Sequence, residues 1–273
     1  YDKYDSQMTL GYILINLTMR FITFNKKTIL YGLSSNSKLE NKEFIEKLDY
    51  IINNGFYFSL RDTNSLEVLN KSGINTNKIK IVDDIVFSYD FSHVRRKQNA
   101  VKKIGIVYIT SFDNNNYLIE YTKKILNYLH SKKINFEISF IPFYNYLGSD
   151  EKVYNEIKQV FDKEKIKVIN YKYDFDSIKE VFLKQDYIIS MRYHGSLIAN
   201  ALGIPCLSLM YKHRHYINKM KYLHDKYKFK KNISYDINDD VLDKLFFEKQ
   251  NTIDCVKISQ TAEKDLKELL KKI

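Results

Sequence analysis

The fold is decided by the stretch Asp186-Tyr-Ile-Ile-Ser-Met-Arg-Tyr-His-Gly-Ser-Leu-Ile-Ala-Asn-Ala-Leu-Gly-Ile-Pro-Cys-Leu-Ser-Leu-Met-Tyr211. Its first apolar run, Tyr187–Met191, predicts a buried strand. Residues Leu197–Leu202 predict a helix that Gly203 ends, and Ile204–Met210 predict the next buried strand. This strand–helix–strand order is typical of an α/β fold with a parallel sheet.

The turn Arg192-Tyr-His-Gly-Ser196 lies between the first strand and the helix. It is therefore expected at the carboxyl end of a parallel strand, where open α/β sheets bind their ligands. Free N–H groups at a helix start favour an anion. The turn predicts a phosphate or carboxylate site, with Arg192, Tyr193, Gly195 and Ser196 as substrate-binding residues.

Strands alternate with helices on both sides of a polar, basic stretch. The first series has strands Lys27–Tyr31, Phe56–Leu60 and Ile79–Val82 and helices 8–24, 41–53 and 64–71. The second has strands 104–109, 136–141 and 167–171 and helices 116–131, 151–163 and 176–185. The strand–helix–strand stretch that contains Arg192 comes next, followed by helices 214–228, 239–249 and 254–272. The alternation predicts two doubly wound, Rossmann-like domains that face a cleft.

We place the domains at residues 1–92 and 103–273, with a linker at 93–102. The last helix is free to pack back on the first domain. The first domain starts midway through its series and the chain begins with Tyr1, so we expect a fragment of a longer protein. The two cysteines, Cys206 and Cys255, are too far apart to suggest a disulfide framework or a zinc site. A reducing, cytoplasmic location fits this usage.

The 273 residues carry a net charge of +11, yet the lysines are spread over nearly every predicted helix. No block of like charges marks a nucleic-acid arm. The charge instead favours anionic substrates or the acidic inner face of a membrane, and no apolar run is long enough to span a bilayer. The pair His213 and His215 lacks neighbouring ligands, so no metal is expected.

Arginine is scarce, with six residues among 44 basic side chains. Arg61, Arg192 and Arg214 each follow an apolar run at a predicted strand end. A guanidinium binds a carboxylate or phosphate through two parallel hydrogen bonds, which lysine cannot reproduce. These arginines are candidate anion ligands; chance placement at the surface, or for Arg192 an ion pair with a carboxylate such as Asp186, is the alternative.

Four local patterns occur in order along the chain. Two are in the first series: Ser59-Leu-Arg-Asp-Thr-Asn-Ser65 with a later Leu and Gly, and Val82-Asp-Asp-Ile-Val-Phe87. Two are in the second: Asp186 to His194, continued by Ala199 to Pro205, and Tyr211-Lys-His-Arg214.

Together these patterns resemble the polysaccharide pyruvyl transferases. The third is similar to the Asp-x-x-Ile-Ser-x-Arg-x-His signature of that family with its Gly-Ile-Pro continuation. The chain departs from the family at Ile85, where proline is usual, and at Arg214, where lysine is usual. The family also begins with a further βα region that carries a Gly-rich turn, which this chain does not show.

The resemblance implies a GT-B-like fold and transfer of a pyruvyl group from phosphoenolpyruvate to a sugar of a bacterial cell-surface polysaccharide, giving a pyruvate ketal. The donor is a substrate, and no cofactor is implied. Arg192 would hold one anionic group of the donor and Arg61 the other, with Tyr211 and Arg214 lining the same cleft. The acceptor would be a glycan or a lipid-linked sugar.

Proton transfer is assigned to His194, which can exchange protons near neutral pH; a histidine that only caps the turn is the alternative. Asp84 is either its acid/base partner or a loop cap. Asp62 is expected to orient Arg61 or cap the following helix rather than to react. Two other functions stay open: a GT-B glycosyltransferase that uses a nucleotide-sugar, and a non-catalytic homologue that binds anionic glycans.

Overall fold

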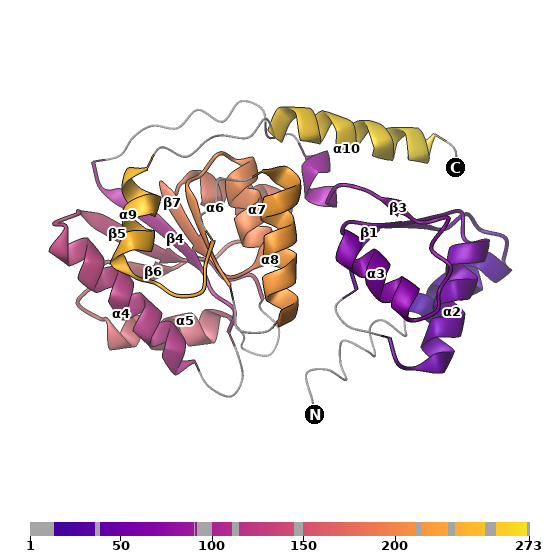
Figure 1. Cartoon of the computed structure of the whole chain (residues 1–273). Helices are drawn as coiled ribbons and strands as arrows, with labels where there is room; N and C mark the ends of the chain where they lie inside the picture. Colours follow the sequence, from indigo (N-terminus) through magenta and orange to yellow (C-terminus); the bar gives the residue numbers. More distant parts are fainter. Residues whose placement is uncertain are drawn as a thin grey trace. The chain divides into compact units, whose positions relative to one another are not determined.

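The computed structural model describes residues 14–35, 39–89, 91, 100–110, 115–144, 150–210, 214–228, 233–248 and 255–271. The chain divides into two compact units (Figure 1). Unit 1 comprises residues 1–90 and 256–273, and unit 2 comprises residues 91–255. Residues 93–99 of the predicted linker lie outside the described part of the chain.

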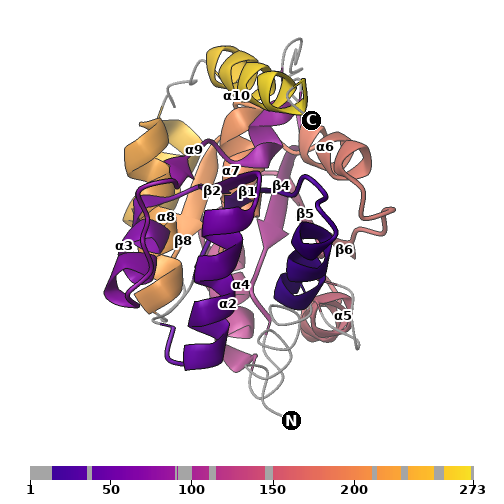
Figure 2. The same ribbon diagram turned by 90° about the vertical axis from the view of Figure 1, so that its right-hand side faces the viewer.

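Unit 1 is built on a parallel three-stranded sheet in the order β1-β2-β3. Its elements are β1 (Ile29–Leu33), β2 (Tyr57–Leu60), β3 (Lys80–Ile81), helical residues 14–23, α2 (Lys42–Asn54), α3 (Thr63–Lys71), the 3-10 helix η1 (Ile85–Ser88) and α10 (Cys255–Leu270). Helices α2 and α3 lie on one face of this sheet and α10 on the other (Figures 1 and 2).

Local signals explain the helices of unit 1. The Asn41 side chain accepts a hydrogen bond from Phe44 N and so begins α2, whose Leu48, Ile51 and Ile52 are buried against the sheet. An Asx cap satisfies one of the N–H groups that a helix start leaves without a partner. The apolar face at helical spacing then joins the helix to the core.

Unit 2 holds a parallel six-stranded sheet in the order β6-β5-β4-β7-β8-β9. The strands are β4 (Lys102–Val107), β5 (Phe136–Phe140), β6 (Ile166–Val168), β7 (Tyr187–Ser190), β8 (Cys206–Leu209) and β9 (Ile233–Ser234). The two central strands are paired from Ile104↔Tyr187 to Val107↔Ser190. This is the strand order of a doubly wound Rossmann fold.

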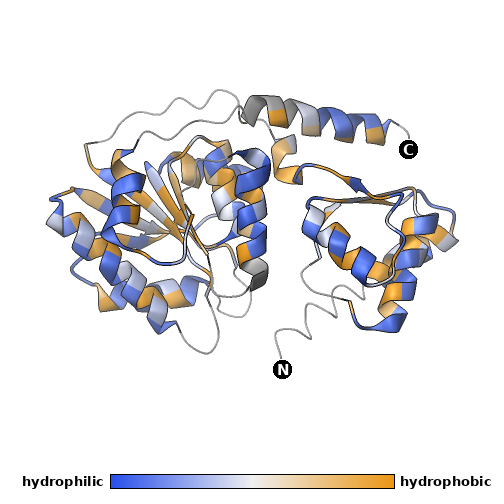
Figure 3. Ribbon diagram, viewed as in Figure 1, coloured by the Kyte–Doolittle hydropathy of each residue, from blue (hydrophilic) through white to orange (hydrophobic). Residues whose placement is uncertain are grey.

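The helices of unit 2 cover both faces of its sheet, as parallel crossovers require. They are α4 (Asn116–Ser131), α5 (Asp150–Val160), α6 (Phe175–Leu183), α7 (Tyr193–Ala201), α8 (Arg214–Tyr227) and α9 (Asp239–Phe247). Helices α4, α5 and α9 share one apolar core with the strands, while α6, α7 and α8 lie on the opposite face (Figure 1). The strands are apolar and the outward helix faces hydrophilic (Figure 3).

The decisive stretch is folded largely as expected, with one important difference. Helix α7 begins at Tyr193, four residues before the predicted start at Leu197, so His194, Gly195 and Ser196 are in its first turn. Gly203 ends the helix region with φ +64°, a conformation that favours glycine. The sequence also missed β9 and η1, which are too short to show a periodic pattern.

None of the helices in the described part of the chain combines the length and the apolar composition needed to cross a lipid bilayer.

Candidate functional site

The candidate site lies at the centre of the sheet of unit 2, where β4 and β7 are neighbours. The chain leaves β4 toward β5 on one side and leaves β7 toward β8 on the other. Such a switch point is where open α/β sheets bind ligands, outside the carboxyl ends of the strands. Tyr108 to Thr110 follow β4 and Arg192 follows β7, so both segments meet at this edge.

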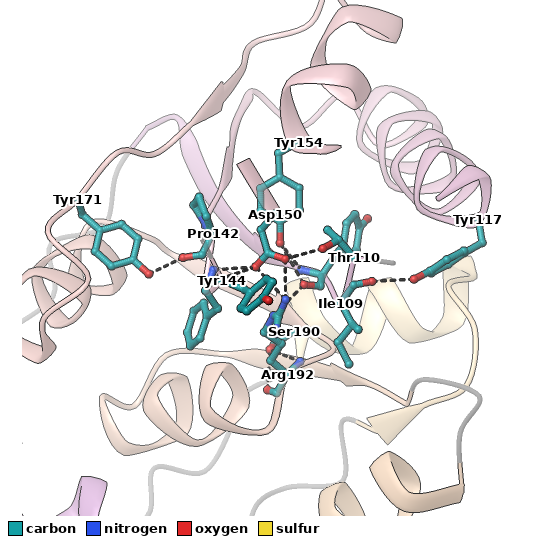
Figure 4. A network of polar contacts seen from close by, with 12 residues as sticks. Ile109, Thr110, Tyr117, Pro142, Tyr144, Asp150, Tyr154, Tyr171, Ser190 and Arg192 are labelled. Atoms are coloured by element: carbon teal, nitrogen blue, oxygen red, sulfur yellow. Dashed lines mark hydrogen bonds and ion pairs between the residues drawn. The ribbon is translucent and has the colours of Figure 1, made fainter. Parts of the chain in front are cut away.

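Arg192 is held by two acceptors that come from different elements (Figure 4). Its Nη2 lies 2.6 and 2.9 Å from the two carboxylate oxygens of Asp150. Its Nε donates to the Tyr108 carbonyl at 3.1 Å. The ion pair with a carboxylate that the sequence allowed therefore exists, but the expected partner was wrong: the Asp186 side chain instead accepts from Lys103 N at 2.8 Å.

Asp150 is fully buried and accepts from several donors besides Arg192. Thr110 Oγ1 donates at 2.7 Å, and the backbone N–H groups of Phe143 and Tyr144 donate at 2.8 and 2.9 Å. A buried carboxylate requires such pairing, because an isolated charge in the interior is very unfavourable. The site is therefore built around a neutralised Asp–Arg pair.

Tyr154 completes this network from the next turn of α5. Its hydroxyl donates to the Tyr108 carbonyl at 3.1 Å and accepts from Tyr108 N at 2.9 Å. Burial raises the pKa of Tyr154 well above its usual value, with a further increase from Asp150. The phenol is thus a buried structural group whose hydroxyl is used on the Tyr108 backbone.

The first turn of α7 is fixed by Ser190, the last residue of β7. Its hydroxyl accepts from Arg192 N at 3.1 Å and donates to Arg192 O at 2.9 Å. Gly195 packs so closely on this serine that a Cβ at its position would lie 2.4 Å from Ser190 Oγ. The glycine is therefore needed for the close approach of the helix to the strand.

Ser196 faces the interior, and its side chain does not sit where a substrate could reach it. It is fully buried, and its hydroxyl accepts from Ser208 Oγ at 2.8 Å. His224 Nε2 lies 3.0 Å from the same Ser208 oxygen, and burial lowers the pKa of His224 to about 4. The Ser196 side chain thus links α7, β8 and α8, and the binding role predicted for Ser196 at the helix start stays a prediction.

Unit 1 contains a second arginine–aspartate pair. Arg61 follows β2, and its Nη1 donates to Asp84 Oδ2 at 2.7 Å. The buried Asp84 also accepts from Val86 N and so begins η1. Asp62 accepts from the backbone and the hydroxyl of Ser65, both at 2.7 Å, and begins α3. Both aspartates thus act as caps, and a reactive role for Asp84 stays a prediction.

The remaining predicted residues divide into two groups. Tyr193 and His194 lie next to Arg192 on α7, half-buried, with their rings in a T-shaped arrangement and centroids 5.2 Å apart. Tyr211 lies outside the described residues; Arg214 begins α8, and its side chain is also outside them. Arg61 and Arg192 belong to different units, so their convergence on one ligand stays a prediction.

The chain matches the family described as polysaccharide pyruvyl transferase over residues 3–213, which is most of its length. It belongs to the polysaccharide pyruvyl transferase family. No curated protein matches it by sequence.

Solved structures show the fold of this pyruvyl transferase family member. The UDP-GlcNAc 2-epimerase of Methanocaldococcus jannaschii has a TM-score of 0.58 and 13% identity, over 93% of this chain and 71% of that one. A putative UDP-N-acetylglucosamine 2-epimerase from Listeria monocytogenes gives 0.53 and 11%, over 95% and 71%. TarM gives 0.51 and 12%, over 90% of this chain and 49% of that one. These are GT-B proteins, so the predicted α/β, GT-B-like fold class is confirmed.

Sequence reasoning missed the support of Arg192. Asp150, Tyr154 and Thr110 lie in segments where no motif marks them, and the helix that contains Asp150 was expected to begin one residue later. A signal did exist: Asp150 is an acidic residue at the start of an amphipathic helix that follows β5, the neighbour of β4 in the sheet. This pattern places Asp150 at the carboxyl edge of the sheet, where it could have been predicted as the partner of Arg192.

Proposed function

We propose that this member of the pyruvyl transferase family transfers a pyruvyl group from phosphoenolpyruvate to two hydroxyls of a cell-surface polysaccharide sugar. The observation that carries the proposal is the placement of Arg192. It stands at the switch point of the sheet, next to the start of α7, and its Nη1 has no hydrogen-bond partner among the described residues. An arginine edge beside a helix N-terminus suits an oxyanion.

The start of α7, like that of α4, is not closed by the side chain of its N-cap residue. Its N-cap residue, Arg192, provides no side-chain cap hydrogen bond. Four other described helix starts are closed by the side chain of an aspartate or asparagine: Asn41, Asp62, Asp174 and Asn238. A carboxylate at a helix start competes with an incoming anion, and α7 has none there. This supports one anionic group of the donor binding at α7.

Ketal formation requires both proton transfer and a leaving phosphate. One acceptor hydroxyl adds to the enol carbon of phosphoenolpyruvate while the methylene carbon gains a proton. The second hydroxyl then displaces phosphate from the same carbon. Of the two hydroxyl protons lost, one is balanced by the new methyl group and the other leaves with phosphate. His194, two residues from Arg192, is the group we assign to this proton transfer.

The proposal extends to partners and location. Arg61, supported by Asp84, would bind the second anionic group of the donor, and the acceptor would be a glycan or a lipid-linked sugar. The reaction needs no cofactor beyond the donor substrate. A net charge of +11 supports action at the acidic inner face of the membrane.

The test is release of phosphate from phosphoenolpyruvate in the presence of a panel of hexosides and N-acetylhexosaminides. Arg192→Lys should lose about 2–4 kcal/mol of transition-state binding, roughly 30- to 1,000-fold in kcat/KM, since lysine cannot bond to Asp150 and Tyr108 and also present a fixed donor to the ligand. Arg20→Lys is the matched control, because Arg20 is exposed in unit 1. Near-normal activity of Arg192→Lys would contradict the assignment.

A thermal-shift assay with the candidate donors separates the alternatives. Thermal stabilisation by a UDP- or GDP-sugar, with no response to phosphoenolpyruvate, would favour a nucleotide-sugar glycosyltransferase. Absence of a response to either ligand would favour a non-catalytic glycan-binding homologue.

A further inference from the structure

The geometry points to Asp150 as the residue that positions Arg192 in the proposed donor site. We infer that Asp150 fixes the plane of the Arg192 guanidinium. The anionic group of the ligand is then bound by the N–H groups of Nη1 rather than by the net charge of the side chain. The identity of that ligand rests on the proposed function. The positioning of Arg192 by Asp150 does not, and it can be measured separately.

Two anchors define the plane of the guanidinium. Nη2 pairs with both oxygens of Asp150 at 2.6 and 2.9 Å, and Nε donates to the Tyr108 carbonyl at 3.1 Å. A planar, rigid group that is fixed at two of its three nitrogens has no freedom to rotate. The third nitrogen, Nη1, is therefore presented in one direction, with the Arg192 side chain 24% exposed.

The first anchor, the Asp150 carboxylate, is held in place by other residues. Asp150 is fully buried, and the donors Thr110 Oγ1, Phe143 N and Tyr144 N hold its two oxygens in place independently of Arg192. Because these three donors remain when the arginine is removed, the carboxylate is prepared in advance for its partner. Pre-organised support of this kind is what a binding group needs to keep its geometry.

Helix α5 provides the second anchor indirectly. Tyr154 lies one turn after Asp150 on the same helix face, and its hydroxyl donates to the Tyr108 carbonyl that also accepts from Arg192 Nε. Figure 4 shows Asp150 and Tyr154 approaching Arg192 together. Helix α5 thus fixes both contacts of the guanidinium. Asp150 makes the first contact directly, and Tyr154 supports the second through the Tyr108 carbonyl.

The pairing also changes what the site recognises. Asp150 cancels the formal charge of Arg192, so the ligand is held by directed N–H groups of Nη1 and α7 more than by net charge. A lysine at position 192 would place its single ammonium on Asp150 and would leave no fixed donor edge. The discrimination between arginine and lysine at this position therefore depends on Asp150.

The experiment uses the Nε–H signals of the arginines in the full chain, recorded by ¹⁵N–¹H NMR. Only six arginines are present, so the Arg192 signal can be assigned by its loss in Arg192→Lys. The Kd of inorganic phosphate and of phosphoenolpyruvate is measured by calorimetry on the same samples. The variants are Asp150→Asn, Thr110→Val, and Asp186→Asn as the matched control, with thermal unfolding followed for each.

In the wild type, the Arg192 Nε–H should exchange with water much more slowly than an exposed arginine. Asp150→Asn should remove this protection and raise the Kd of either anion about tenfold or more, because the charge-assisted contact of Nη2 with the two carboxylate oxygens is lost. Thr110→Val should have a smaller effect in the same direction. Asp186→Asn should leave both readouts within about twofold of wild type, since Asp186 bonds to Lys103 N and not to Arg192.

Fast exchange of the wild-type Arg192 signal, or an unchanged signal and Kd in Asp150→Asn, would overturn the inference. If Asp150→Asn does not fold, the wild-type exchange rate and Thr110→Val still decide it. If the Arg192 signal responds as expected but the wild type binds phosphate and not phosphoenolpyruvate, the positioning role stands and the proposed function is wrong.

Discussion

Arg61 Nη1 donates to Asp84 Oδ2 at 2.7 Å, which joins a residue assigned to binding with one assigned to proton transfer. Asp84 is 1% exposed and Arg61 is 16% exposed in their side chains, so the pair is largely removed from water. A carboxylate that is both paired with an arginine and used as a helix cap is stabilised in its charged form. This arrangement favours Asp84 as the support of Arg61 over Asp84 as a proton donor.

Loss of this pair should destabilise unit 1. Asp84→Ala leaves a partly buried guanidinium without this carboxylate and should lower the free energy of unfolding by about 3 kcal/mol. Urea denaturation measures the change. The control is Glu67→Ala, which breaks an exposed pair with Lys71 on α3 and should stay within about 0.5 kcal/mol of wild type. Equal effects of the two substitutions would contradict the structural role of Asp84.

The role of His194 can be decided by the pH dependence of kcat. If His194 transfers a proton, His194→Asn should lower kcat by about 10²-fold or more and remove one limb of the pH profile. If it only supports the turn, kcat should fall little and the profile should keep its shape. Phosphate release from phosphoenolpyruvate between pH 5 and about 9, spanning the ordinary histidine range, gives the comparison.

Gly195 should not tolerate a side chain. In Gly195→Ala the new Cβ would meet Ser190 Oγ at 2.4 Å and Val107 Cγ1 at 3.3 Å, so we expect a loss of about 1–3 kcal/mol of stability. Ser190→Ala removes the nearer atom but also the hydroxyl that begins α7. The double variant should therefore be less destabilised than the sum of the two single variants. Simple additivity would show that the contact is not the cause.

Stability should fall in acid because of His224. Burial holds its pKa at about 4, below the unfolded value of 6.5, and nearby Asp225 only partly opposes the shift. The unfolded chain then binds a proton that the folded chain excludes, so stability is complete above pH 6.5 and declines as the pH falls toward 4. The loss from this residue approaches about 3 kcal/mol.

Urea midpoints at several pH values, compared between wild type and His224→Gln, isolate that contribution. The variant should show a flatter dependence between pH 6.5 and 4, whereas His130→Gln, at an exposed histidine, should follow the wild type. Parallel curves for the wild type and His224→Gln would show that His224 is not the titrating group.

Periodic elements were the most predictable from sequence. Helix α4 has the bounds expected, 116–131, because its apolar positions repeat at helical spacing along sixteen residues. The start of α7 was misplaced because Arg192-Tyr-His-Gly offers none of the side chains that usually cap a helix, and the structure shows no side-chain cap there. The hydroxyl that fixes Arg192 at this helix start belongs to Ser190, which the sequence places in the preceding strand.

The candidate site was only half predictable. Arg192 and His194 were found because they lie between a predicted strand and a predicted helix. In a parallel α/β sheet, that turn is always at the carboxyl edge of the sheet. Asp150 was not found, since it is 42 residues away and its pairing depends on how two crossovers bring α5 to β7. The sequence suggested Asp186 because it is near in the chain, and nearness along the chain does not measure distance across a sheet.

The central position of β4 and β7 has a consequence for how the chain acquires its site during synthesis. Arg192 is made 84 residues after Tyr108 and 42 after Asp150, so both acceptors emerge from the ribosome before their donor exists. The Asp150–Arg192 pair therefore forms only after β7 pairs with β4, and such non-local pairing is slow to form. The contacts of Arg192 thus require β7 to be synthesised and paired, while β8 and β9 of the same sheet still follow in the chain.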